Sequence, residues 1–231
     1  MSNTKQLPTS ERQEPPRLLP FRWLAAIGLG GVALVLYLAT LSRGAFPGLP
    51  AKSLVWQLQL DIRPLLLDSL WGYLVWALSY LPGGSVAFWV GVSSAVFGAL
   101  CVVLLSLLTM RLRYSLHDQH DPAEVRREAQ ASLLAGVVAG LFLMGSIPFW
   151  ILANRSLPGA FHLLLLLSAT FLFSEYQRTG RVGFLYALGL LYGVGISEFA
   201  TFWMFAPLTA LLVDRAMLQR AEFSMRVLVR T

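Results

Sequence analysis

The chain has 231 residues, of which 56% are hydrophobic and only 13% are charged, and its mean hydropathy is +0.64. In soluble domains roughly a quarter of the residues are charged and just under half are apolar. The composition therefore excludes a disordered chain, a collagen-like repeat and a water-soluble enzyme, and it predicts an integral membrane protein. The single cysteine, Cys101, lies in an apolar run and excludes an internal disulfide and a cysteine-based metal site.

Six apolar runs follow one another along the chain. A helix needs about 20 apolar residues to cross the hydrocarbon core, and shorter runs can cross where the bilayer is locally thinned. The runs predict an all-α membrane protein with about six transmembrane helices, at residues 21–42, 86–110, 131–152, 158–174, 182–196 and 199–213. We expect this transmembrane module, residues 21–213, to lie between two basic tails at residues 1–20 and 214–231.

Positive charge gathers on one side of this predicted topology. Fourteen Lys and Arg residues fall on the side of the N-terminus, and four fall on the other side, namely Arg43, Lys52, Arg63 and Arg155. Lys and Arg are enriched in cytoplasmic loops. The distribution predicts that both termini are cytoplasmic and that the protein lies in the inner or plasma membrane of the cell. We therefore attribute the net charge of +6 to the orientation of the chain in the membrane and to contacts with membrane lipid. No nucleic-acid partner is expected.

The long first outer loop, residues 43–85, is not a plain connection. Two apolar stretches at residues 54–60 and 65–81 are rich in Trp and Tyr, but Asp61, Arg63, Pro64 and Asp68 interrupt them. Aromatic side chains favour the boundary between headgroups and hydrocarbon. We expect two amphipathic helices on the outer surface, the second of which begins near Pro64. In an alternative topology the second stretch crosses the membrane, which would move ten of the inner positive charges outside.

The order of these features resembles a bacterial membrane family that is grouped with protein O-mannosyltransferases in the GT-C glycosyltransferase superfamily. The resemblance covers roughly residues 20–213, and it is carried by short stretches at residues 82–84, 94–99, 146–150, 176–181 and 193–198. It implies transfer of a sugar from a polyprenyl-phosphate donor to a protein or glycan acceptor on the outer face of the membrane.

The chain departs from the usual signature of such families. No carboxylate occurs in residues 46–52, where an acidic motif is expected, and residues 63–66 keep one proline of a His-Pro-Pro-Gly turn. The acidic residue that usually follows the Phe149-Trp150 pair is also missing. An alternative function is therefore a catalytically inactive membrane scaffold or lipid-binding protein with the same fold. The chain can also be a fragment, a split gene product or a minimal member.

Three carboxylates are expected on the outer side, and they are the candidates for catalysis. Glycosyl transfer to a hydroxyl group needs a general base that accepts its proton. Asp61, Asp68 and Glu198 are the residues that can supply it. The alternatives are a helix cap for Asp61, solvent exposure for Asp68, and a turn residue in the headgroup region for Glu198.

Arg63, Arg155 and His162 are the candidates for substrate binding. A guanidinium group near the departing phosphate stabilises its charge, and a histidine near the outer end of a span can carry a proton. The alternatives are a headgroup contact for Arg155 and a hydrogen bond to a neighbouring helix for His162.

Two further patterns predict structural features and no catalytic or binding site. His117 and His120 alternate with acidic residues in the long inner loop, which favours a solvated helix start, so we predict neither a metal site nor a cofactor. Glycines stand four apart at positions 136 and 140 and again at 189 and 193, a spacing that allows two helices to approach closely.

Overall fold

A computed structural model describes residues 19–41, 49–58, 69–112 and 122–228 of the chain. In these ranges the regular structure consists of helices alone. They are α1 (Leu19–Ala39), α2 (Leu49–Gln57), α3 (Ser69–Leu78), α4 (Val86–Arg111), α5 (Pro122–Gly145), α6 (Ile147–Asn154), α7 (Gly159–Thr179), α8 (Val182–Glu198) and α9 (Ala200–Leu228). Five of the helices described, α1, α4, α5, α7 and α9, are long and apolar enough to cross a membrane. The predicted all-α membrane fold is thus confirmed, and α8, with 17 residues, is an apolar but shorter helix.

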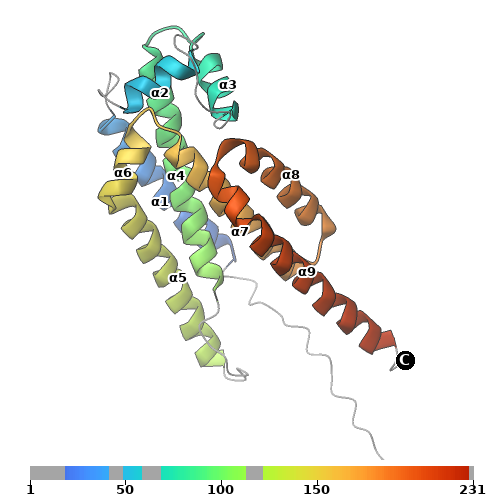
Figure 1. Ribbon diagram of the computed structural model, residues 1–231. Coiled ribbons are helices and arrows are strands. Elements are labelled where there is room, and N and C mark those ends of the chain that lie inside the picture. Colours follow the sequence, from blue (N-terminus) through green and yellow to red (C-terminus); the bar gives the residue numbers. More distant parts are fainter. Residues whose placement is uncertain (1–18, 42–48, 59–68, 113–121, 229–231) are drawn as a thin grey trace, which may run out of the picture.

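Helices α1, α4, α5 and α7 run in alternating directions. The first turn of α1 meets α5 where Arg22 Nη2 donates to Ser132 Oγ at 3.2 Å, and the last turns of α4 and α7 meet at the ion pair of Arg111 with Glu175. Helices α8 and α9 then form a hairpin beside α7, and α9 returns to the end of the bundle where α1 begins (Figure 1). The short helices α2 and α3 lie at the opposite end, at the top of Figure 1.

Small side chains allow α4 to occupy the centre of the bundle. Its buried face includes Ser94, Ala95, Gly98 and Ala99, and it packs against α1, α5, α6 and α7. A Cβ atom on Gly98 would lie 2.8 Å from the Cβ of Ala153, so only glycine permits this approach of α6. Close packing of small residues is a principal source of helix association in membranes.

The apolar run over residues 131–152 is divided into α5 and α6. Helix α5 ends at Gly145, and Ser146 adopts an extended backbone with φ −68° and ψ 119° before α6 begins at Ile147. Pro148 stands in the first turn of α6, where its missing N–H is not needed for the helix. The chain can therefore change direction here without losing a helical hydrogen bond.

Two helices, α2 and α3, are present in the outer loop as predicted, but α2 begins at Leu49, before the expected stretch at residues 54–60. They are short, with 9 and 10 residues, and α3 begins at Ser69. The expected helix start near Pro64 lies outside the described residues. At the other end of the chain, α9 continues as far as Leu228, through most of the expected C-terminal tail.

Candidate functional site

Glu198 is the last residue of α8, and its side chain is only 1% exposed. One carboxylate oxygen accepts a hydrogen bond from the backbone N–H of Leu70, and the other accepts one from Trp71 at 3.2 Å. These two N–H groups belong to the first turn of α3, where a helix has no carbonyl partners of its own. Glu198 therefore caps α3 from a distant part of the sequence.

The position of Glu198 also explains how a carboxylate can be buried here. A helix N-terminus carries a partial positive charge, and negative side chains are stabilised beside it. At the C-terminal end of α8, by contrast, the charge of Glu198 would be unfavourable if α3 were absent. Because both oxygens are engaged by N–H donors, the carboxylate binds α8 to α3 and fixes where α3 begins.

Aromatic rings surround this contact. Trp71 is 1% exposed, stacks on Phe161 of α7 with ring centroids 5.9 Å apart, and also contacts Phe97 of α4 at 6.4 Å. Tyr73 and Trp76 of the same helix are exposed, as expected for side chains at a membrane boundary. Helix α3 thus buries one aromatic residue against α4 and α7 and presents others outward.

His162 lies beside the same contact. Its side chain is buried, and its ring stacks on Phe199 with centroids 4.5 Å apart and an interplanar angle of 15°. Phe199 follows Glu198 directly in the chain and caps the end of α8, with its backbone N–H donating to the Gly195 carbonyl at 2.9 Å. The structure therefore brings Glu198 and His162 to one place, at the meeting point of α3, α7 and the turn between α8 and α9.

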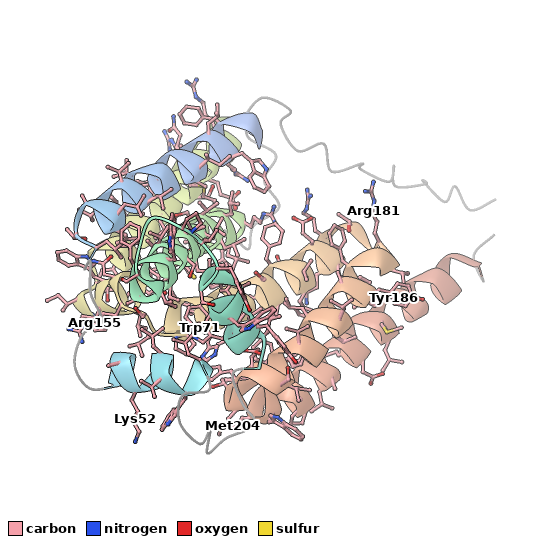
Figure 2. The ribbon with its side chains drawn as sticks, turned by 90° about the horizontal axis from the view of Figure 1, so that it is seen from above. Lys52, Trp71, Arg155, Arg181, Tyr186 and Met204 are labelled. Carbon is pink, nitrogen blue, oxygen red and sulfur yellow. The ribbon has the colours of Figure 1, made fainter. Side chains whose placement is uncertain are left out.

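Arg155 occupies a different edge of this end of the molecule. It follows α6, is half-buried, and in Figure 2 lies at the left of the view, away from Trp71. The next residue, Ser156, is buried and donates a hydrogen bond to the Ala87 carbonyl at 3.1 Å, which ties the connection between α6 and α7 to the start of α4. The segment that carries Arg155 is therefore attached to the start of α4 by this hydrogen bond.

The other candidate residues lie outside the described residues. They are Asp61, Arg63 and Asp68 and, for the histidine-rich inner loop, residues 117–121. Asp68 directly precedes Ser69, the first residue of α3, so it stands two positions before Leu70 in the sequence. Within the part of the chain that the structure describes, no group of three or more His, Cys, Asp or Glu side chains could hold a metal ion.

A second charged cluster lies at the opposite end of the bundle and was not among the candidate residues predicted from the sequence. Glu175 of α7 is 5% exposed and forms ion pairs with Arg111 and, at 3.1 Å, with Arg178. The Arg111 guanidinium also lies 4.3 Å from the ring centroid of Phe171. Glu175 and Arg178 are three residues apart on α7, a spacing that could have suggested their pair, but the contact with α4 has no local signal.

Comparison with known families identifies the chain. Residues 68–220, about two thirds of the chain, match the family described as Protein O-mannosyl-transferase TMEM260 N-terminal domain. The chain belongs to this family. This confirms the grouping with protein O-mannosyltransferases that the sequence motifs suggested. No curated protein and no solved structure matches the chain.

The TMEM260 N-terminal match covers the chain from Asp68 through all of α3 to α8 and most of α9. Glu198, His162 and Arg155 fall inside it, as do both partners of the cap on α3. Asp61 and Arg63 fall before its first residue. The helices that build the contact of α3 with α8 are therefore all part of the family domain.

Proposed function

We propose that this chain forms the membrane module of a glycosyltransferase, over residues 21–213, that transfers a sugar from a polyprenyl-phosphate donor to a protein or glycan acceptor. Mannose is the first sugar to consider, because the family is described by O-mannosyl transfer. The observation that carries the proposal is the family match together with the Glu198 cap, which fixes α3 immediately after Asp68. The active site then lies at the end of the bundle that carries α2 and α3.

In the proposed reaction the acceptor hydroxyl oxygen attacks the anomeric carbon of the sugar, and the bond from that carbon to the donor phosphate oxygen breaks. The phosphate leaves with the bonding electrons, and the hydroxyl proton passes to a carboxylate. Asp61 and Asp68 are the proposed proton acceptors, because both oxygens of Glu198 already accept hydrogen bonds. We assign Glu198 to positioning α3.

Arg63 and Arg155 are the proposed partners of the departing phosphate, since a guanidinium group presents a planar set of donors to phosphate oxygens. His162 is the proposed second proton carrier beside the site. Its ring is held against Phe199, which fixes the imidazole relative to the cap on α3. We propose no organic cofactor for this reaction, because the donor already carries an activated sugar.

Substitution of the two aspartates tests the proposal. We expect Asp61→Asn or Asp68→Asn to lower the initial rate of mannose transfer at least tenfold, because a positioned general base contributes roughly 100-fold or more. The assay follows radiolabelled mannose from a polyprenyl-phosphate donor to a peptide acceptor, with the full chain in proteoliposomes. Asp214→Asn is the matched control, because Asp214 is exposed on α9 at the opposite end.

One result would contradict the assigned bases, and another would contradict the transferase itself. If Asp61→Asn and Asp68→Asn both transfer mannose at the rate of the parent, neither aspartate is the general base. Absence of transfer by the parent chain with mannose and other polyprenyl-linked sugars would favour the alternative, a membrane scaffold or lipid-binding protein. The missing acidic motif in residues 46–52 supports that alternative.

We propose further that the end carrying α2 and α3 faces outward from the inner or plasma membrane, with both termini cytoplasmic. The basic residues in the described ranges support this orientation. Lys52 and Arg155 lie at the end with α2 and α3, whereas the opposite end carries Arg22, Arg111, Arg126, Arg127, Arg178, Arg181 and Arg215. Positive charge marks the cytoplasmic side of membrane proteins.

Cysteine labelling in intact cells tests this orientation. A membrane-impermeant maleimide is expected to label Ser197→Cys, beside the cap on α3, and to label Thr179→Cys at the opposite end only after permeabilisation. Both positions are exposed, and the native Cys101 is fully buried and serves as the unlabelled background. The reverse pattern would invert the topology and move the proposed site to the cytoplasmic side.

A further inference from the structure

A cavity of about 190 Å³ lies between α1 and α5, at the end of the bundle far from the proposed active site. Its lining is almost wholly apolar and consists of Phe21, Arg22, Ala129, Gln130 and Leu133. Pockets that enclose a whole small molecule are larger, with volumes of roughly 300–1,000 Å³. The cavity is therefore suited to part of a longer apolar ligand whose remainder lies in the bilayer.

Arg22 gives this apolar cavity a specific polar group. Its guanidinium donates one hydrogen bond, from Nη2 to Ser132 Oγ at 3.2 Å, and its Nε is buried with no acceptor among the described residues. A guanidinium has five N–H donors in a planar fork. The buried Nε is closed off from a ligand, whereas the two Nη groups retain donors that match the oxygens of a phosphate group.

Helix α5 extends the positive charge beyond the residues that line the cavity. Arg126 precedes Gln130 by four residues, so it lies on the same face of α5, one turn nearer the helix start. Its side chain is exposed, as is that of Arg127. The acidic Glu128 stands two residues from Arg126 and from Gln130, a spacing at which side chains do not share a helix face.

We propose that this cavity binds an anionic phospholipid, with part of an acyl chain against Phe21, Ala129 and Leu133 and the phosphate between Arg22 and Arg126. The charge complementarity and the apolar lining point to the same ligand. Basic pockets between transmembrane helices bind the headgroups of anionic lipids in this manner. The site goes beyond the proposed transfer reaction and is independent of it, because it lies at the opposite end of the bundle.

Native mass spectrometry of the full chain in detergent, titrated with phosphatidylglycerol, tests the site. We expect Arg22→Gln to weaken binding of the first lipid about tenfold, which is roughly 1.4 kcal/mol. Arg215→Gln is the matched control, since Arg215 is exposed on α9 at the same end of the bundle, and we expect less than a twofold change. Phosphatidylcholine, which has no net charge, is expected to bind equally to both variants and to the parent.

A second variant separates the cavity from the charge. Ala129→Phe fills the apolar lining while Arg22 and Arg126 remain, and we expect it to weaken phosphatidylglycerol binding by at least fivefold. Folding is checked by the reactivity of Cys101, which is fully buried in the native chain. Equal losses in Arg22→Gln and Arg215→Gln would indicate a diffuse basic belt and would overturn the site. Parent-like binding in either Arg22→Gln or Ala129→Phe would do the same.

Discussion

Replacing Glu198 by alanine is expected to lower the unfolding temperature of the protein by about 6 to 12 °C. The substitution leaves the buried backbone N–H of Trp71 and the part-buried backbone N–H of Leu70 without their acceptor. Each unsatisfied buried group costs roughly 1 to 3 kcal/mol, so we expect a loss of about 3 kcal/mol. A loss of 1 kcal/mol shifts the unfolding temperature of a chain of this size by roughly 2 to 4 °C.

The chain carries its own probe for this measurement. Cys101 is its single cysteine and is fully buried, so a thiol-reactive fluorophore reports unfolding during a temperature ramp. Glu198→Gln keeps one carbonyl oxygen as an acceptor and is expected to lie between the parent and the alanine variant. Asp214→Asn, on an exposed position of α9, should stay within about 1 °C of the parent. An unfolding temperature equal to that of the parent in Glu198→Ala would contradict the cap.

The same variant connects stability to the proposed reaction. If Glu198 positions α3, and with it Asp68, Glu198→Gln should lower the transfer rate at temperatures where the protein is still folded. If Glu198 contributes only to stability, the rate should be unchanged at those temperatures. Comparing the two measurements on one variant distinguishes these roles.

Substitution of Gly136 by valine is expected to destabilise the protein by about 3 kcal/mol, whereas Gly193→Val should have little effect. A Cβ atom on Gly136 would lie 2.7 Å from the backbone carbonyl oxygen of Ser106 and would also meet the side chain of Met110. Overpacking of this kind typically costs roughly 1 to 3 kcal/mol, and valine adds three carbon atoms. A Cβ atom on Gly193 meets nothing within 4 Å.

The two glycine variants control for each other, because both place the same side chain in an apolar helix of the same protein. Unfolding of both is followed by the reactivity of Cys101. We expect Gly136→Val to unfold about 6 to 12 °C below the parent and Gly193→Val to unfold within about 2 °C of it. A similar loss in both variants would show that the cost comes from valine in a helix and not from the contact of α5 with α4.

These glycines show what spacing in a sequence can and cannot predict. Both pairs stand four residues apart in apolar runs, and the sequence predicts close helix approach for each. Only Gly136 and Gly140 meet a neighbouring helix, whereas Gly189 and Gly193 face open space in the described part of the chain. The spacing determines which face of a helix carries small residues, but the arrangement of the other helices determines whether another helix packs against that face.

The transmembrane helices were more predictable than the site. Apolar runs of sufficient length locate them because the bilayer requires such runs, and the all-α membrane fold follows directly. Burial within the site depends on pairs that are distant in sequence. Tryptophan is typical of a membrane boundary, but Trp71 is buried between α4 and α7. Nothing near Glu198 in the sequence indicates that its hydrogen-bond partners are Leu70 and Trp71.

The cap on α3 also constrains the order in which the protein can assemble. Glu198 lies 127 residues after Trp71, so it is synthesised long after α3 and after every helix from α4 to α7. Until α8 has been made, the first N–H groups of α3 lack the carboxylate that they bind in the finished structure. Because chains are synthesised from the N-terminus, the end of the molecule that we propose as the active site can only take its final form late, once the last hairpin of helices has joined the bundle.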